Sequence, residues 1–142
     1  MKIINSWQIF ALGSAIFAGL TALLGKIGVA NINSNFATFI RVCVILVLTT
    51  LFLCAANQWQ RPQTIAAKTW IFLVLSGITT ALSWLCYYRA LQLGPVSKVA
   101  SIDKLSIVIA IVLGILFLGE KFSWQVLIGG GFIMIGAILI LF

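Results

Sequence analysis

The 142-residue sequence contains no histidine and only two acidic residues, Asp103 and Glu120. Its three cysteines, Cys43, Cys54 and Cys86, lie inside apolar runs and lack the spacing of a metal site or a disulfide framework. Without histidine to act as a base, and with the two carboxylates near opposite ends of one apolar segment, hydrolytic and nucleophilic catalysis lack the groups they need. We therefore expect no enzyme: no catalytic residues, no metal and no cofactor.

Charged residues are also scarce, at 8% of the chain against 63% hydrophobic residues. A soluble globular domain has about 25% charged residues, because polar groups must cover its surface. The nine lysines and arginines stand singly at the ends of apolar segments and form no basic patch, which argues against a nucleic acid partner. The expected partner is therefore the lipid bilayer, with the basic side chains reaching its surface.

Five apolar runs are long enough to cross a bilayer, which takes about 20 residues per helix. The fourth run must begin near Val96, because its uninterrupted apolar part, Ile107 to Leu118, is too short to span. Leu93-Gly94-Pro95 is a stop signal for the third helix. The sequence predicts a single all-α integral membrane domain over residues 1–142, with helices at 7–30, 36–56, 69–91, 96–118 and 124–142.

A cleaved signal peptide is the alternative for the first run, because Lys2 precedes it. The run is long for a signal core and lacks a clear cleavage site of the A-x-A type. We therefore expect the first run to remain in the protein as a membrane-spanning helix.

The basic residues specify orientation weakly. If the side on which the first helix begins is side A, it carries Lys2, Arg61, Lys68 and Lys121, whereas side B carries Lys26, Arg89, Lys98 and the deeper Arg41 and Lys104. The excess of lysine and arginine that marks a cytoplasmic side is therefore nearly absent. Two interpretations follow: both orientations occur and pair antiparallel, or other features fix a single orientation.

Four tryptophans mark the membrane interface on side A, because their amphipathic rings suit the headgroup layer. They are Trp7, Trp59, Trp70 and Trp124.

Three charged residues lie inside the predicted helices. Arg41 is six residues from side B, and Asp103 and Lys104 are eight, which puts them at depths of roughly 9 and 12 Å. Because a charge within a bilayer is costly, these side chains should face a partner or a wet cavity. We expect Asp103 to pair with Arg41 and Lys104 to point elsewhere, which leaves a positive cavity suited to an anionic or zwitterionic ligand. The alternative is a purely stabilising ion pair.

Trp84, Tyr87 and Tyr88 share one face of the third helix, by their i, i+3, i+4 spacing, and Arg89 follows them. They are candidates for an aromatic wall of a ligand cavity, with helix packing as the alternative. On the fifth helix, Gly129 and Gly136 share a face that is a candidate subunit contact.

Several short motifs resemble a known family. They are Tyr88-Arg89-Ala90-Leu91, Gly94-Pro95-Val96-Ser97, Leu116-Phe117-Leu118-Gly119-Glu120-Lys121, Ile128-Gly129-Gly130 and Gly136-Ala137, together with a tryptophan at the first helix and an arginine early in the second. Together they resemble the EamA-type domain of the drug/metabolite transporter superfamily. The resemblance implies a half-transporter unit of five helices, which usually occurs twice in one chain with inverted topology. Many members carry a proline where this chain has Ser101-Ile102-Asp103-Lys104.

On this resemblance we expect a multi-pass protein of the bacterial inner membrane that exports a small metabolite by alternating access. The odd number of helices lets a lone unit pair with an antiparallel copy of itself or with a related half. Asp103 is the first candidate for proton coupling because it lies deeper, and Glu120, beside Lys121 at the interface, is the second. The alternatives are a non-transporting membrane subunit or scaffold, and a flippase subunit for a lipid-linked sugar with a lateral opening lined by Arg41 and Lys104.

Overall fold

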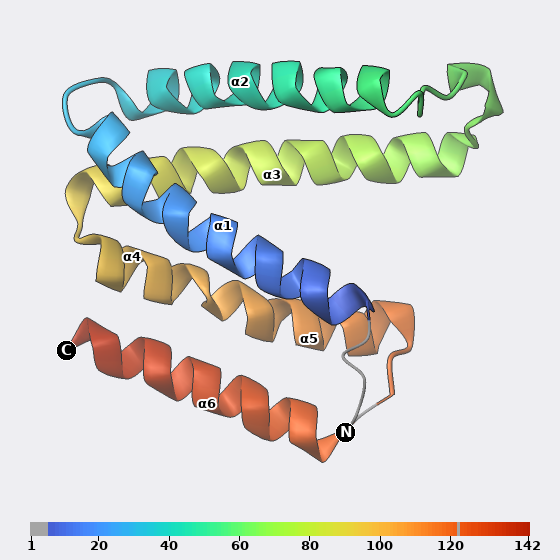
Figure 1. Ribbon diagram of the computed structural model, residues 1–142. Helices are drawn as coiled ribbons and strands as arrows, with labels where there is room; N and C mark the ends of the chain where they lie inside the picture. Colours follow the sequence, from blue (N-terminus) through green and yellow to red (C-terminus); the bar gives the residue numbers. More distant parts are fainter. Residues whose placement is uncertain (1–5, 122) are drawn as a thin grey trace. The chain divides into compact units, whose positions relative to one another are not determined.

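The computed structural model describes residues 6–121 and 123–142, and each regular element among them is a helix (Figure 1). Lys2, which the charge count places on side A, lies outside the described residues. The elements are α1 (Ser6–Val29), α2 (Ser34–Ala55), the short 3-10 helix η1 (Pro62–Thr64), α3 (Ala67–Leu93), α4 (Val96–Asp103), α5 (Leu105–Leu118) and α6 (Trp124–Leu141).

Five segments of the described chain are long and apolar enough to cross a membrane. They are Trp7–Val29, Ser34–Ala55, Ala67–Leu93, Val96–Leu118 and Trp124–Leu141. The predicted fold class, all-α with five membrane-spanning segments, is thereby confirmed. Large apolar side chains such as Phe10, Phe52 and Phe132 are at least 70% exposed, as expected where lipid is the solvent.

The helices form two compact units, one made of residues up to Leu24 together with Leu93–Phe142, the other of Gly25–Gln92. In the first unit, α4 and α5 both pack on α6. Gly130 of α6 is buried there, and a Cβ atom at this position would lie 3.3 Å from Cδ1 of Ile111 in α5. Small residues thus let these two helices approach closely, as is common between membrane helices.

The predicted subunit face of α6 points away from this packing. Gly129 is exposed and Gly136 half-buried, and a Cβ atom at either would meet no atom within 4 Å. Both positions therefore have room for a neighbouring helix, and their role in a subunit contact stays a prediction.

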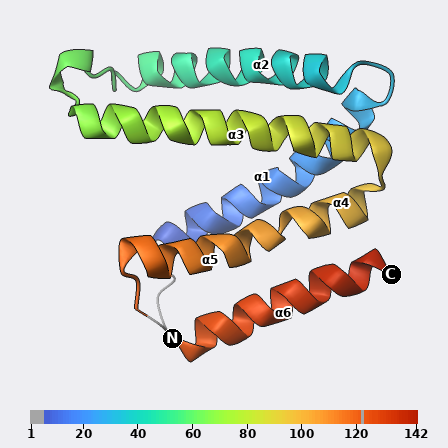
Figure 2. The same ribbon diagram turned by 180° about the vertical axis from the view of Figure 1, so that it is seen from behind.

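In the second unit, α2 and α3 lie side by side and antiparallel in both views of the ribbon (Figures 1 and 2). The Asn33 side chain begins α2 by accepting a hydrogen bond of 2.9 Å from the backbone N–H of Asn35. α3 ends at Leu93, before Gly94 and Pro95. The last turn of α1, from Gly25 to Val29, completes this unit.

Two lysines bind the carboxyl ends of neighbouring helices. Lys26 Nζ of α1 donates a hydrogen bond of 2.6 Å to the carbonyl of Leu91, in the last turn of α3. Lys98 Nζ of α4 donates one of 2.5 Å to the carbonyl of Leu141, at the end of α6. The last carbonyls of a helix have no partner within it and carry a partial negative charge, so a lysine there is doubly favourable.

These two contacts predict local effects of removing each lysine. We expect Lys26→Met to speed hydrogen–deuterium exchange at the end of α3 about fivefold, and Lys98→Met to do the same at the end of α6, because each bond contributes about 1 kcal/mol. Each variant is the control for the other. Faster exchange at both helix ends in either variant would show general destabilisation instead of a local loss.

Candidate functional site

Arg41 of α2 lies over two aromatic rings of α3. Its guanidinium carbon is 4.2 Å from the centroid of the Trp84 ring and 5.5 Å from that of Tyr88. Arginine is attracted to the negatively charged face of an aromatic ring, most strongly where water is scarce. The structure therefore places Trp84 and Tyr88, two predicted cavity residues, in contact with Arg41, a third one.

The antiparallel pairing of α2 and α3 accounts for this meeting. Arg41 is seven residues after the start of α2, a rise of roughly 10 Å. Tyr88 and Trp84 are five and nine residues before the end of α3, which corresponds to roughly 7 and 14 Å. Because residues four apart share a helix face, both rings lie at the level of the guanidinium and on the side of α3 that faces α2.

Within its own unit, residues 25–92, the guanidinium of Arg41 forms no hydrogen bond or ion pair with a described residue. Arg41 makes the two ring contacts, and no hydrogen bond or ion pair with a described residue is recorded for it. Residues 25–92, the whole of its unit, contain five lysines and arginines and no aspartate or glutamate. Because guanidinium carries five N–H donors in its plane and stacking uses only its face, those donors are available to a ligand.

Gly25 of α1 makes room for the Tyr88 ring. A Cβ atom at Gly25 would lie 3.2 Å from Oη of Tyr88 and 3.3 Å from Cδ1 of Leu91. Tyr88 is only 6% exposed and Leu91 is fully buried. Glycine at this position therefore allows the last turn of α1 to pack closely against the hydroxyl end of Tyr88 and against Leu91.

The other two candidates on α3 do not stack on Arg41 in the described structure. Tyr87 is half-buried and packs edge-on against Tyr88, with 6.4 Å between ring centroids. Arg89 is exposed and donates a hydrogen bond of 2.7 Å to Oε1 of Gln92. Gln92 in turn donates one of 3.0 Å to the carbonyl of Ile32, so this end of α3 is tied to the connection between α1 and α2.

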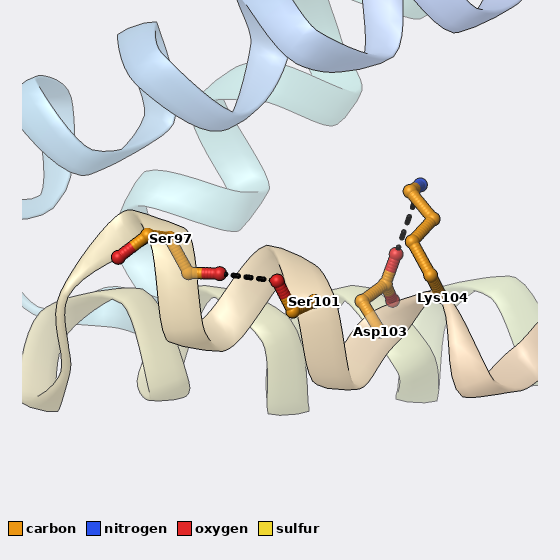
Figure 3. Close-up of polar contacts among 4 residues, drawn as sticks. All are labelled: Ser97, Ser101, Asp103 and Lys104. Carbon is orange, nitrogen blue, oxygen red and sulfur yellow. Dashed lines mark hydrogen bonds and ion pairs between the residues drawn. The ribbon is translucent and has the colours of Figure 1, made fainter. Parts of the chain in front are cut away.

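The fourth span is interrupted at the charged pair. Lys104 separates α4 from α5, and its backbone N–H and C=O bond to Ser101 and Ile107, three residues away on either side. The Ser101 hydroxyl donates to the carbonyl of Ser97 at 2.7 Å, a type of bond that bends helices (Figure 3). A short 3-10 turn inside a helix often marks a hinge or a functional site.

Asp103 and Lys104 form an ion pair at this interruption, with 3.5 Å between Oδ2 and Nζ (Figure 3). Their side chains are 38% and 51% exposed, respectively. The long lysine side chain thus spans the 100° step between successive helix positions. The expectation that Lys104 points away from Asp103 is therefore wrong. Asp103 and Arg41 belong to different units, and their pairing stays a prediction.

Glu120 lies beyond the end of α5, where Gly119 has the left-handed φ of 65° that glycine tolerates. Its backbone N–H donates to the carbonyl of Gly114, and a Cβ atom at Gly114 would lie 3.0 Å from its carboxylate. The carboxylate of Glu120 therefore folds back against α5, instead of extending from the connection to α6.

Sequence reasoning missed Gly25, Lys26 and Gln92 as residues that shape this region. Glycine and lysine together near the end of the first apolar run were the available signal, since glycine inside a helix costs stability unless close packing needs it. The sequence pattern does not indicate which ring or carbonyl these residues contact. Among the described residues, no group of three or more His, Cys, Asp or Glu side chains could hold a metal ion.

Comparison with known proteins gives one family for nearly the whole chain. Residues 5–142 match the EamA-like transporter family. A protein of Sinorhizobium sp named "Uncharacterized transporter in cobO 3'region" is 53% identical over 136 residues, which are 96% of this chain and 96% of that protein. No solved structure matches significantly. With its five apolar helices, the chain is thus a multi-pass membrane protein, and it belongs to the EamA-like transporter family.

Proposed function

We propose that this chain transports a small anionic or zwitterionic metabolite across the bacterial inner membrane, and that Arg41 binds the anionic group of the substrate. The supporting observation is the stacked guanidinium of Arg41, whose N–H donors have no described protein partner. A charge within the apolar layer is costly unless it meets a partner or water. A substrate carboxylate or phosphate is a suitable partner, because the planar fork of arginine binds such groups through two hydrogen bonds.

The aromatic residues define how such a substrate binds. In this proposal Trp84 and Tyr88 position the guanidinium through their rings, and the anion binds to its N–H groups in the guanidinium plane. Tyr87, next to Tyr88, and Arg89, one residue further, complete the substrate path on α3 in this proposal.

The interruption of the fourth span supplies the second element of the proposal. A 3-10 turn inside a helix often marks a functional site, and secondary transporters place substrate and coupling-ion sites at irregular points of their membrane helices. Asp103 and Lys104 stand at such a turn, between α4 and α5. We assign them to the substrate path and Asp103 to proton coupling, with Glu120 as the second coupling candidate.

Coupling through Asp103 predicts that replacing this residue removes transport driven by a proton gradient. In vesicles containing the purified chain, we expect Asp103→Asn to abolish substrate movement driven by a proton gradient while exchange of substrate for substrate continues, because exchange needs no net proton transfer. Glu120→Gln is the matched comparison, since it removes the other carboxylate. Asp103→Asn vesicles that still respond fully to the gradient would remove Asp103 from the coupling mechanism.

We further propose that two copies pair in opposite orientations and alternate access to the two sides, with export as the working direction. Five spans put the two ends of the chain on opposite sides, so an inverted second copy reproduces the arrangement of inverted repeats. The near balance of four and five basic residues on the two sides favours insertion in both orientations.

Dual orientation is tested by reporters at the carboxyl terminus. We expect a reporter active only in the cytoplasm and one active only in the periplasm both to give signal, because the weak charge bias permits both insertions. Adding two lysines at the connection between α2 and α3 should shift the population strongly toward one signal. Activity of a single reporter in the unmodified chain would exclude the antiparallel homodimer and leave pairing with a related half.

Transport itself is tested with the purified chain reconstituted in vesicles. A panel of carboxylates, amino acids and phosphomonoesters is first screened for thermal stabilisation of the protein, and those that stabilise are tested for uptake. We expect uptake by this chain alone. Binding to no panel member, together with no flux, would favour a scaffold subunit, whereas transbilayer movement of a lipid-linked sugar would favour the flippase.

A further inference from the structure

We propose that the connection between α2 and α3, residues 56–66, contains a binding site for the phosphate headgroup of an anionic phospholipid. The connection borders an open surface hollow of about 770 Å³, a volume in the range of small-molecule sites. Its lining residues are Leu53, Asn57, Gln58, Trp59, Gln60 and Ile65. This site is separate from Arg41 and does not depend on the proposed transport function.

The backbone of the connection is folded so that its side-chain amides remain available. Asn57 adopts the left-handed φ of 52°, and the N–H groups of Asn57 and Gln58 donate to the carbonyls of Cys54 and Leu53 at the end of α2. The side chains of Asn57, Gln58 and Gln60 form no recorded hydrogen bond with the residues described. Three amide groups, each with two N–H donors, thus line a hollow without a protein acceptor.

The positive charge of this region favours binding of an anion. Arg61 follows the hollow directly, and Lys68 begins the first turn of α3. Both side chains are exposed, and neither has a recorded partner among the described residues. Because residues 25–92 lack aspartate and glutamate, nothing within this unit neutralises them. A phosphate diester complements both the amide donors and the two cations.

The position of the hollow selects a lipid over a soluble anion. It lies directly between the spans Ser34–Ala55 and Ala67–Leu93, at the level where helices leave the bilayer. Trp59 and Trp70 flank it, and tryptophan prefers the headgroup layer. Their indole N–H groups donate to Cys54 Sγ at 3.4 Å and to the Pro62 carbonyl at 3.5 Å, which orients the rings on the connection. Leu53 and Ile65 add an apolar wall for the glycerol and upper acyl chain.

The experiment titrates dioleoyl-phosphatidylglycerol into the purified full chain in an uncharged detergent and counts bound lipid by native mass spectrometry. We expect one tightly retained lipid per chain. Arg61→Gln with Lys68→Gln should weaken binding about 25-fold, since each cation near an anionic headgroup contributes about fivefold. Gln58→Leu with Gln60→Leu should weaken it about tenfold, because the donors are lost and the charge is kept. Lys121→Gln, another exposed cation outside this connection, should leave it unchanged.

Other outcomes would overturn the proposal. Equal weakening by Lys121→Gln would show general attraction to the protein charge. Equally tight binding of dioleoyl-phosphatidylcholine would show that the site does not recognise the net negative charge of the headgroup. Displacement of the lipid by millimolar inorganic phosphate would identify a site for a soluble anion. Thermal unfolding without lipid distinguishes a binding defect from misfolding, because the variants should unfold at the same temperature as the unmodified chain.

Discussion

Replacing Arg41 by glutamine is expected to weaken binding of the transported anion about 100-fold and to stop its uptake. Two hydrogen bonds from a guanidinium to an anion contribute about 3 kcal/mol together, which corresponds to this factor. Arg41→Lys should be intermediate, with about a tenfold loss, because lysine keeps the charge but lacks the planar fork and stacks poorly on Trp84. Anion affinity is measured by calorimetry and uptake in vesicles.

Arg89→Gln is the matched control for the loss of charge. Arg89 is on α3, one residue after Tyr88, but it is exposed and bonded to Gln92 instead of stacked on the rings. Because Arg89 lies in the proposed substrate path as an exposed charge that contacts neither ring, we expect this variant to weaken anion binding by at most about fivefold, far less than Arg41→Gln. An Arg41→Gln protein that binds and transports as well as the unmodified chain would refute the proposed site, whatever the effect of Arg89→Gln.

A methyl group at Gly25 is expected to destabilise the second unit by about 1–3 kcal/mol, as overpacking of a filled site does. Its Cβ atom would lie 3.2 Å from Tyr88 Oη and 3.3 Å from Leu91 Cδ1, so these two buried side chains must shift. Gly28→Ala, three residues along the same helix, is the matched control, because a Cβ atom there meets nothing within 4 Å. It should be neutral or slightly stabilising, since alanine favours helix.

The second variant, Tyr88→Phe, separates crowding from other causes. Phenylalanine keeps the ring that Arg41 contacts and removes the hydroxyl, the atom closest to the added methyl group. The double variant Gly25→Ala with Tyr88→Phe should recover at least half of the lost thermal stability in detergent. Equal melting temperatures of Gly25→Ala and Gly28→Ala would show that Gly25 is not needed for close packing.

The membrane class and the number of spans could be predicted from the sequence because the bilayer imposes a length and a polarity on every crossing. About 20 apolar residues are needed whatever the neighbouring helices are, so the five runs were sufficient evidence. The end of α3 could also be predicted, because Gly94 favours a non-helical backbone conformation and Pro95 lacks the N–H that would continue the helix. Such features depend on the chain and its solvent alone.

The turn at Lys104 within the fourth span has no clear signal in the sequence. The sequence predicts one span from 96 to 118, and the structure has that span, Val96–Leu118, with Lys104 between α4 and α5 inside it. No proline or glycine stands there to signal a kink. The turn is made by backbone hydrogen bonds between residues three apart around Lys104 and by the hydrogen bond from the Ser101 hydroxyl to the Ser97 carbonyl. These bonds depend on local side chains and not on the pattern of polarity.

The sequence by itself determined the solvent of this protein and its five membrane-spanning segments, because these follow from polarity and from the length of a crossing. Only the tertiary structure decided that the guanidinium of Arg41 stacks on two aromatic rings of α3, that Gly25 receives Tyr88, and that Lys26 binds the end of α3. The physical reason is that a membrane helix is apolar all round. Its rotation about its own axis therefore follows from packing with its neighbours, which no single run of residues contains.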